Sequence, residues 1–92
     1  MNQMNLLIEL LEMSNIPFEV TDCWGSPQVC YPSKENCICD AVCHWFSYGG
    51  DEGLLEIMGL VEEVDDSVEG WLTAEEVFHR IAHHYYTHIK EN

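Results

Sequence analysis

Positively charged side chains are scarce in this sequence. Lys34, Arg80 and Lys90 are the only Lys and Arg residues among 92, against 17 Asp and Glu, and the formal net charge is -14 with neutral histidines. Phosphate contacts require clustered Lys and Arg, and a field of this sign repels a polyanion. The composition therefore excludes direct binding of nucleic acid, and it predicts that any protein partner is basic where it makes contact.

Long apolar runs and a basic leader are lacking as well. The opening segment, MNQMNLLIELLEM, carries no positive side chain, and Glu9 and Glu12 interrupt its apolar residues. A signal peptide begins with a positively charged region, and a membrane-spanning helix needs about 20 mostly apolar residues. We therefore expect no membrane association and a cytoplasmic location.

The motifs of common enzyme sites are missing too. The segment GGDEG at residues 49 to 53 contains no lysine, and its two carboxylates would repel a phosphate group. Cys43 beside His44 and Asp40 has the residue types of thiol catalysis. However, neighbours on a strand point to opposite faces, and no glycine-rich oxyanion turn accompanies them. We expect no enzymatic activity and no cofactor.

What the chain does contain is enough apolar sequence for one folded domain spanning residues 1–92. Hydrophobic residues make up 47% of the chain, too many for a disordered acidic tail. Helical spacing of leucines predicts a helix over residues 3–14, and Thr73 with Glu76 forms a capping box that starts a second helix over 74–89.

Between these two helices the pattern predicts strands around residues 16–20, 29–31 and 37–46, and a short buried helix in the segment LLEIMGLVEEV at 54–64. The expected fold is α+β. It has an N-terminal helix, a three-stranded antiparallel sheet and two C-terminal helices packed on one face.

An acidic run is the most informative feature. Ten carboxylates and no Lys or Arg occur between Asp51 and Glu76. Such a run can be a solvated face that keeps the protein soluble, or a surface that imitates the phosphates of nucleic acid and occupies a basic groove. The candidate partner-binding residues are Asp51, Glu52, Glu62, Glu63, Asp65, Asp66 and Glu69.

Part of that run can also be aligned with a calcium-binding loop of the EF-hand type. Residues 65 to 76 place oxygen donors at Asp65, Ser67, Glu69 and Thr73, with glycine in the sixth position and Glu76 in the last. Val68 is unusual for such a loop, and the helix cap already explains Glu76. Calcium binding remains an alternative.

Zinc is the other metal alternative. The candidate ligands are Cys37, Cys39, Cys43 and His44, although a regular strand would turn His44 away from the three cysteines. Two pairs four residues apart on the last helix, His79 with His83 and His84 with His88, could add ligands. Otherwise the five cysteines are reduced thiols that pack as small apolar side chains.

The aromatic residues exceed what so small a core readily hides. Trp24, Trp45, Trp71 and the pair Tyr85-Tyr86 are either mostly buried, or one or two of them form an apolar centre within an acidic rim. The second arrangement is typical of a protein interface or a homodimer contact.

Two blocks, SYGGDEGLLEIMGL at 47–60 and GWLTAEEVFHRI at 70–81, resemble short uncharacterised proteins of phages and prophages of Gram-positive bacteria. The resemblance implies a phage origin and a bacterial host cytoplasm, and it carries no assigned activity. In size and composition the chain is similar to acidic anti-CRISPR and anti-restriction inhibitors, many of which mimic DNA. We therefore expect a non-enzymatic interaction protein that binds a basic surface of a host or phage nucleic-acid-handling protein. The alternative is a small metal-binding accessory domain.

Overall fold

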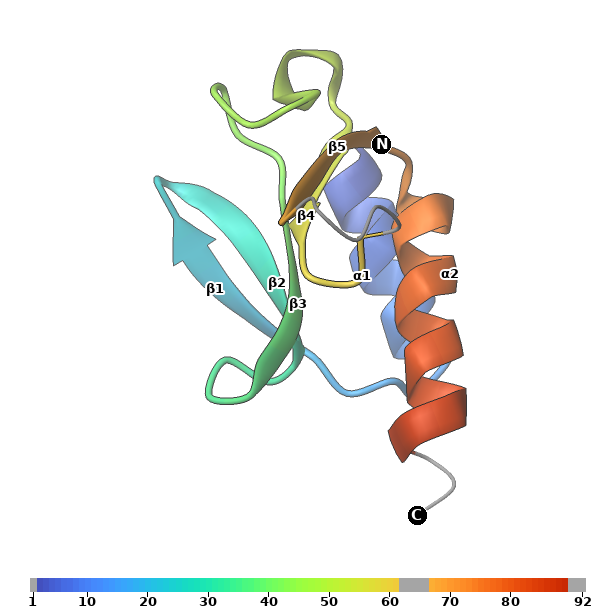
Figure 1. Ribbon diagram of the computed structural model, residues 1–92. Helices are drawn as coiled ribbons and strands as arrows, with labels where there is room; N and C mark the ends of the chain where they lie inside the picture. Colours follow the sequence, from blue (N-terminus) through green and yellow to red (C-terminus); the bar gives the residue numbers. More distant parts are fainter. Residues whose placement is uncertain (1, 62–66, 90–92) are drawn as a thin grey trace.

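Five antiparallel strands and two helices form two layers in the computed structural model, which describes residues 2–61 and 67–89 (Figure 1). The elements follow one another as α1 (Gln3–Met13), β1 (Glu19–Cys23), β2 (Ser26–Pro32), β3 (Cys37–Val42), the 3-10 turn η1 (Gly50–Glu52), β4 (Leu55–Met58), β5 (Val68–Leu72), α2 (Ala74–His84) and the π-helical turn η2 (Tyr85–Ile89). The strand order β1-β2-β3-β4-β5 is a simple meander.

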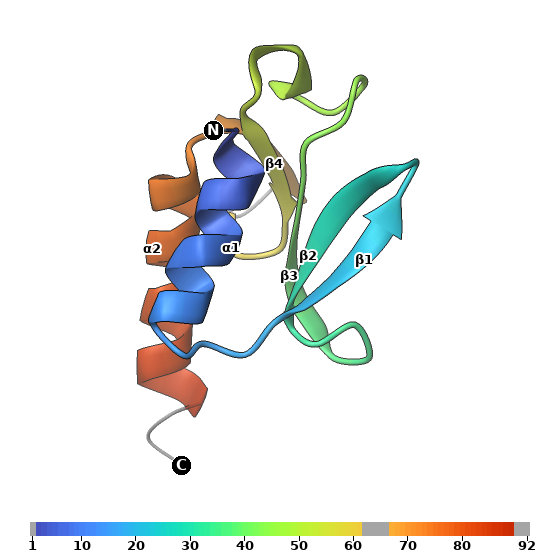
Figure 2. The same ribbon diagram turned by 180° about the vertical axis from the view of Figure 1, so that it is seen from behind.

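Both helices lie side by side on the same face of the sheet (Figures 1 and 2). The side chain of Asn2 caps the start of α1, and Thr73 and Glu76 form the predicted capping box of α2. The amide of Ala74 donates to Oε1 of Gln3 at 2.7 Å, which ties the first turns of the two helices together. The helix starts are therefore fixed both locally and to each other.

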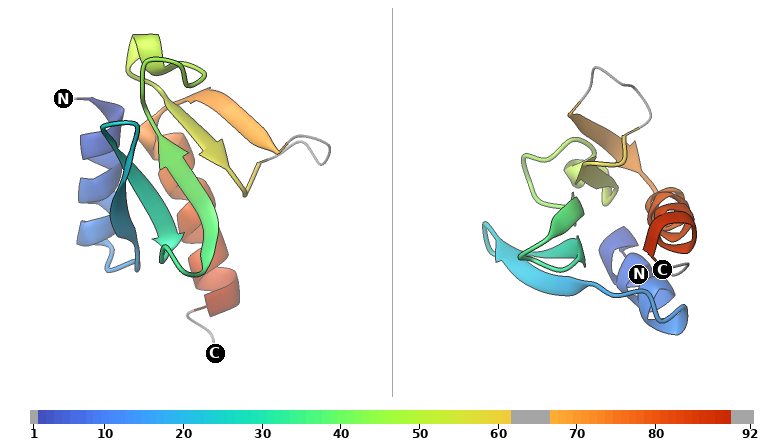
Figure 3. Two further views of the ribbon diagram at one scale, coloured as in Figure 1. Left: turned by 90° about the vertical axis from the view of Figure 1, so that its left-hand side faces the viewer. Right: turned by 60° about the horizontal axis from the view of Figure 1, so that its bottom comes forward.

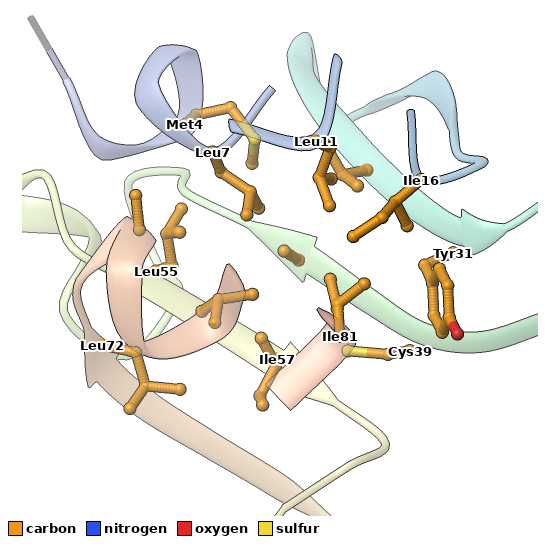
Figure 4. Close-up of a cluster of buried hydrophobic side chains, with 14 residues drawn as sticks. Met4, Leu7, Leu11, Ile16, Tyr31, Cys39, Leu55, Ile57, Leu72 and Ile81 are labelled. Atoms are coloured by element: carbon orange, nitrogen blue, oxygen red, sulfur yellow. The ribbon is translucent and has the colours of Figure 1, made fainter. Parts of the chain in front are cut away.

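The core fills the space between the helices and the inner face of the sheet (Figure 4). In the helices the buried core residues recur every three or four positions, and in the strands they recur at every second position. These spacings follow from the geometry of a helix and of a strand. Removing each of these large side chains from water stabilises the fold by about 1.5–3 kcal/mol. The main core residues are Met4, Leu7 and Leu11 of α1, Val77 and Ile81 of α2, and Val29, Tyr31, Cys39, Ala41, Leu55, Ile57 and Leu72 of the strands.

The expected three-stranded sheet followed by two C-terminal helices is wrong, because the described residues form a five-stranded sheet with one helix before it and one after it. The segment predicted as a helix at 54–64 contains β4, in which Leu55 and Ile57 are buried in the core while Met58 is exposed. Ala41 of β3 pairs with Ile57. A short apolar run fits a buried strand as well as a helix, and tertiary pairing decides between them. The part of the predicted helix at 62–64 lies outside the described residues.

Two further predictions about the strands are also corrected. β5 was not expected, and it becomes the edge strand beside β4, with Leu72 opposite Leu55. The third strand was expected to reach residue 46, but β3 ends at Val42 and residues 43–54 form a loop that carries η1. The helices predicted at 3–14 and from 74 onward are confirmed, although the second changes to π-helical geometry at Tyr85.

Figure 3 shows that the turn between β1 and β2 and the loop at 43–54 lie at the same end of the molecule. The two edge strands, β1 and β5, belong to opposite sides of the sheet. Among the described residues, no helix has the length and apolar character needed to cross a membrane.

Candidate interaction surface

All three tryptophans are exposed, which is unusual for the largest apolar side chain in a small domain. The exposed fractions are 75% for Trp24, 78% for Trp45 and 58% for Trp71, and Phe46 and Tyr48 are about half exposed. We call these five residues the aromatic surface. Its members come from the β1–β2 turn, the loop at 43–54 and β5.

The rings of the aromatic surface form two contacting groups, one of Trp24, Phe46 and Trp45 and the other of Tyr48 and Trp71. The ring centroid of Phe46 lies 5.5 Å from that of Trp24 and 4.6 Å from that of Trp45, with both pairs edge-to-face. Tyr48 and Trp71 are stacked at 5.5 Å with an interplanar angle of 18°. Contacts of this kind contribute about 0.5–1.5 kcal/mol beyond area burial, so they hold the rings in place.

The turn that carries Trp24 has a backbone that few residues adopt. Trp24 and Gly25 form the two-residue connection between β1 and β2, and their φ angles are +55° and +82°. Positive φ at both central residues is the pattern of a type I′ hairpin turn, in which Asn-Gly is preferred. The carboxylate of Asp22 accepts a hydrogen bond from the amide of Gly25 at 3.2 Å. A bulky tryptophan at the first position costs about 1–2 kcal/mol in backbone strain.

The loop that carries Trp45, Phe46 and Tyr48 is closely hydrogen-bonded. The hydroxyl of Ser47 accepts from the amide of His44 at 3.0 Å and donates to its carbonyl at 2.9 Å. A Cβ atom at Gly50 would collide with that same carbonyl and with Oγ of Ser47, so only glycine allows the chain to pass this closely. The aromatic side chains are therefore presented on a fixed backbone.

The same loop is attached to the sheet at two points. The amide of Tyr48 donates to Oε1 of Glu56 in β4 at 2.9 Å, and the carbonyl of Tyr48 accepts from the amide of Trp71 in β5 at 3.1 Å. Gly70 faces Tyr48 so closely that a Cβ atom there would collide with the Cβ of Tyr48. These contacts fix the position of the Tyr48–Trp71 stack relative to the strands.

A buried histidine lies beneath this surface. His44 is 8% exposed, its ring centroid lies 4.1 Å from that of Phe46, and its Nδ1 atom has no hydrogen-bond partner among the described residues. A buried polar atom without a partner costs about 1–3 kcal/mol. The ring of His44 therefore packs against Phe46, although burying its Nδ1 atom without a hydrogen-bond partner destabilises the fold.

Charges around the aromatic surface are negative. Asp51 and Glu52 are exposed on η1 in the same loop, and Asp22 is exposed beside the Trp24 turn. On the sheet, burial and then the nearby carboxylate of Glu56 raise the pKa of Asp40. The remaining exposed described carboxylates belong to both layers, so charge alone does not single out one face. They are Glu9, Glu12, Glu19, Glu35, Glu75 and Glu76.

The predicted partner-binding carboxylates have different positions. Asp51 and Glu52 are exposed on η1, in the loop that carries Trp45, Phe46 and Tyr48. Glu69 instead forms a bidentate ion pair with Arg80, with oxygen–nitrogen distances of 2.6 and 2.7 Å. Glu62, Glu63, Asp65 and Asp66 lie outside the described residues.

The candidate metal ligands are dispersed. Cys37 is exposed, Cys39 is in the core, Cys43 is half-buried and His44 is buried. In the calcium alternative, Asp65 is not described, Ser67 precedes the strand β5, Glu69 pairs with Arg80, and Glu76 caps α2. Within residues 2–61 and 67–89, no group of three or more His, Cys, Asp or Glu side chains could hold a metal ion.

Four of the five cysteines have a raised pKa, whereas a nucleophilic thiol needs a lowered one. Burial is the main cause that raises the pKa of Cys23 and of Cys43, and it raises the pKa of Cys37 to about 11 and that of Cys39 to about 12. A catalytic thiol requires a lowered pKa, because the thiolate is the reactive form.

A separate pocket lies between the residues that follow β4 and the helix α2. Its volume is about 270 Å³, and it is lined by Leu60, Val61, Arg80, His83, His84 and His88. Nδ1 of His84 is hydrogen-bonded to the hydroxyl of Tyr31 at 2.7 Å. The only described arginine in it is already engaged by Glu69.

Comparisons of this chain with protein-family models, with curated proteins and with solved structures gave no match. Its function is therefore inferred from the chemistry and geometry of the surface itself.

Proposed function

We propose that this chain is a non-enzymatic, phage-type interaction protein that binds a basic surface of a nucleic-acid-handling protein of the host cell and thereby inhibits it. The observation that carries the proposal is the aromatic surface, which is exposed, lies partly on a closely hydrogen-bonded loop, and shares that loop with the exposed carboxylates of Asp51 and Glu52. Such a surface has the composition of a binding hot spot, in which a few aromatic residues supply most of the affinity.

The energetic cost of the surface supports a binding role. Leaving three indoles in water forgoes burial energy, and the positive φ angles of Trp24 and Trp71 add backbone strain. The fold offsets these costs elsewhere. A partner that covers the rings would recover the burial energy, and because the loop is already fixed, little ordering entropy would be lost.

Charge determines the class of partner. With a net charge of -14, the protein repels nucleic acid, anionic membranes and a second copy of itself at long range. It attracts a basic surface and speeds the encounter with it. Basic surfaces are typical of proteins that bind nucleic acid, so occupying one would exclude the nucleic acid.

The test begins with the tagged protein and a bacterial lysate at low salt. A captured protein supports the proposal only if it binds a labelled oligonucleotide and the acidic protein displaces that oligonucleotide in a competition assay. The Trp24→Ala/Trp45→Ala variant should lose the displacement. A captured protein that keeps its oligonucleotide at saturating inhibitor would overturn the proposal.

A matched pair of charge variants separates local contact from overall charge. Asp51→Asn/Glu52→Gln removes two charges beside the aromatic surface, and Glu9→Gln/Glu12→Gln removes two from α1. We expect the first variant to weaken the complex more than the second at about 150 mM salt, where screening leaves short-range contacts dominant. Equal losses would mean that the aromatic surface is not the contact region.

A further inference from the structure

We infer that Trp24 and Trp45 form a recognition site for the guanidinium group of an arginine side chain in the basic partner. This inference rests on the proposed function and adds the chemical group that is recognised. Indole is the strongest aromatic acceptor for a cation, and an arginine can stack on it through its flat face.

The ring geometry leaves the indoles open to such a ligand. Both tryptophans contact the one ring of Phe46 edge-to-face, with interplanar angles of 78° and 74°. Each nevertheless keeps three quarters or more of its side chain exposed. The ring of Phe46 in turn packs against the buried ring of His44, so both indoles contact a side chain that is itself packed in place.

Carboxylates on the same loop and turn as the two tryptophans provide the second element of arginine recognition. Asp51 and Glu52 are exposed on η1, in the same loop as Trp45, and Asp22 fixes the turn that carries Trp24. A guanidinium ion can stack on an aromatic face while its N–H groups reach a carboxylate, since it presents five donors in one plane. A lysine ammonium is a compact and strongly hydrated charge, which fits this combination less well.

Other ligands of exposed tryptophans fit the site less well. Proteins that stack nucleobases on aromatic rings do so along a positively charged groove, whereas the charges here are negative. A purely apolar partner would leave the carboxylates beside the rings without compensation, and burying such charges is costly.

The test uses oligo-arginine and oligo-lysine peptides of equal length and charge, with affinity measured by calorimetry. We expect the arginine peptide to bind about fivefold more tightly, with shifts of the indole N–H signals of Trp24 and Trp45 in NMR spectra. Trp24→Leu/Trp45→Leu keeps two apolar side chains without π faces and should abolish the preference. Trp45→Phe should retain part of it.

These outcomes separate the inference from the proposed function. Equal affinity for the two peptides, or a preference that survives Trp24→Leu/Trp45→Leu, would overturn arginine recognition, even if the protein still displaces nucleic acid from its target. Indole shifts produced by a neutral oligosaccharide such as maltoheptaose, and not by oligo-arginine, would also overturn it. Because Trp24 and Trp45 are both exposed, these variants should fold normally, which circular dichroism can check.

Discussion

The hydroxyl group of Tyr31 lies 2.7 Å from Nδ1 of His84, which joins β2 to the end of α2. The two rings also meet edge-to-face, with their centroids 5.6 Å apart. Tyr31 is fully buried, and burial raises its pKa to about 12, so the hydroxyl stays protonated at neutral pH. This contact anchors the last turn of α2 just before the helix changes to π geometry at Tyr85.

Tyr31→Phe should lower the free energy of unfolding by about 1 kcal/mol, because it removes one hydrogen bond and leaves the aromatic packing in place. Denaturant unfolding of both proteins measures the change. A double-mutant cycle with His84→Asn isolates the pairwise part. A coupling energy of zero would mean that the hydroxyl contributes nothing through His84.

Protonation of His84 should destabilise the fold. Burial, and then the neighbouring His88 and His83, lower its pKa below the ordinary 6.5, so the native state favours the neutral ring. The stabilisation is therefore complete above pH 6.5 and is lost as the pH falls from there through the lowered native pKa. Unfolding free energies between about pH 7.5 and about pH 5.5 should fall less steeply in His84→Gln than in the wild type.

Asp40→Asn should stabilise the protein at neutral pH. Burial and the charge of Glu56 raise the pKa of Asp40, so the native state favours the protonated form. The favourable contribution is present below the unfolded pKa of 3.8 and is lost as the pH rises through the raised native pKa. Melting temperatures should therefore show a gain of a few degrees for Asp40→Asn at pH 7 and no gain in acid. A lower melting temperature at pH 7 would contradict this account.

Gly50→Ala should destabilise the aromatic loop by about 1–3 kcal/mol, because the new methyl group collides with the carbonyl of His44 and the hydroxyl of Ser47. Gly53→Asn is the control, since no atom lies within 4 Å of the added Cβ and asparagine tolerates the positive φ there. Hydrogen exchange of the Ser47 and Gly50 amides should accelerate in the first variant and not in the second.

The helices were predictable from the sequence because their signals are local. A capping box and leucines at helical spacing need no partner elsewhere in the chain. β4 and β5 were missed for the opposite reason, because their pairing depends on contacts that local periodicity does not encode. Leu55 and Ile57 alternate with polar or exposed positions, but Leu54 and Met58 mask this pattern in the sequence.

The candidate interaction surface was predictable only in part. The sequence indicated an excess of aromatic residues and an acidic rim, but it could not tell which rings are buried. Trp24 is exposed because a two-residue turn places it at the hairpin tip, and Trp45 because β3 ends at Val42. A tryptophan directly before glycine, between two strand patterns, was the one local signal for an exposed ring.

Trp24→Asn should make the protein more stable and a weaker binder. Asparagine adopts the positive φ of a type I′ turn with little strain, so the free energy of unfolding should rise by about 1 kcal/mol. The same change removes one of the two indoles, and the affinity for oligo-arginine should fall about threefold.

Trp24→Ala is the matched control for this trade-off, because it also removes the indole but leaves a residue that disfavours positive φ. Both variants should lose affinity to the same extent, and only Trp24→Asn should gain stability in denaturant unfolding. If Trp24→Asn binds oligo-arginine as tightly as the wild type, then the strained conformation of Trp24 does not serve recognition. Equal destabilisation of both variants would mean that the contact between the indole of Trp24 and Phe46 stabilises the fold by more than the backbone strain at Trp24 costs.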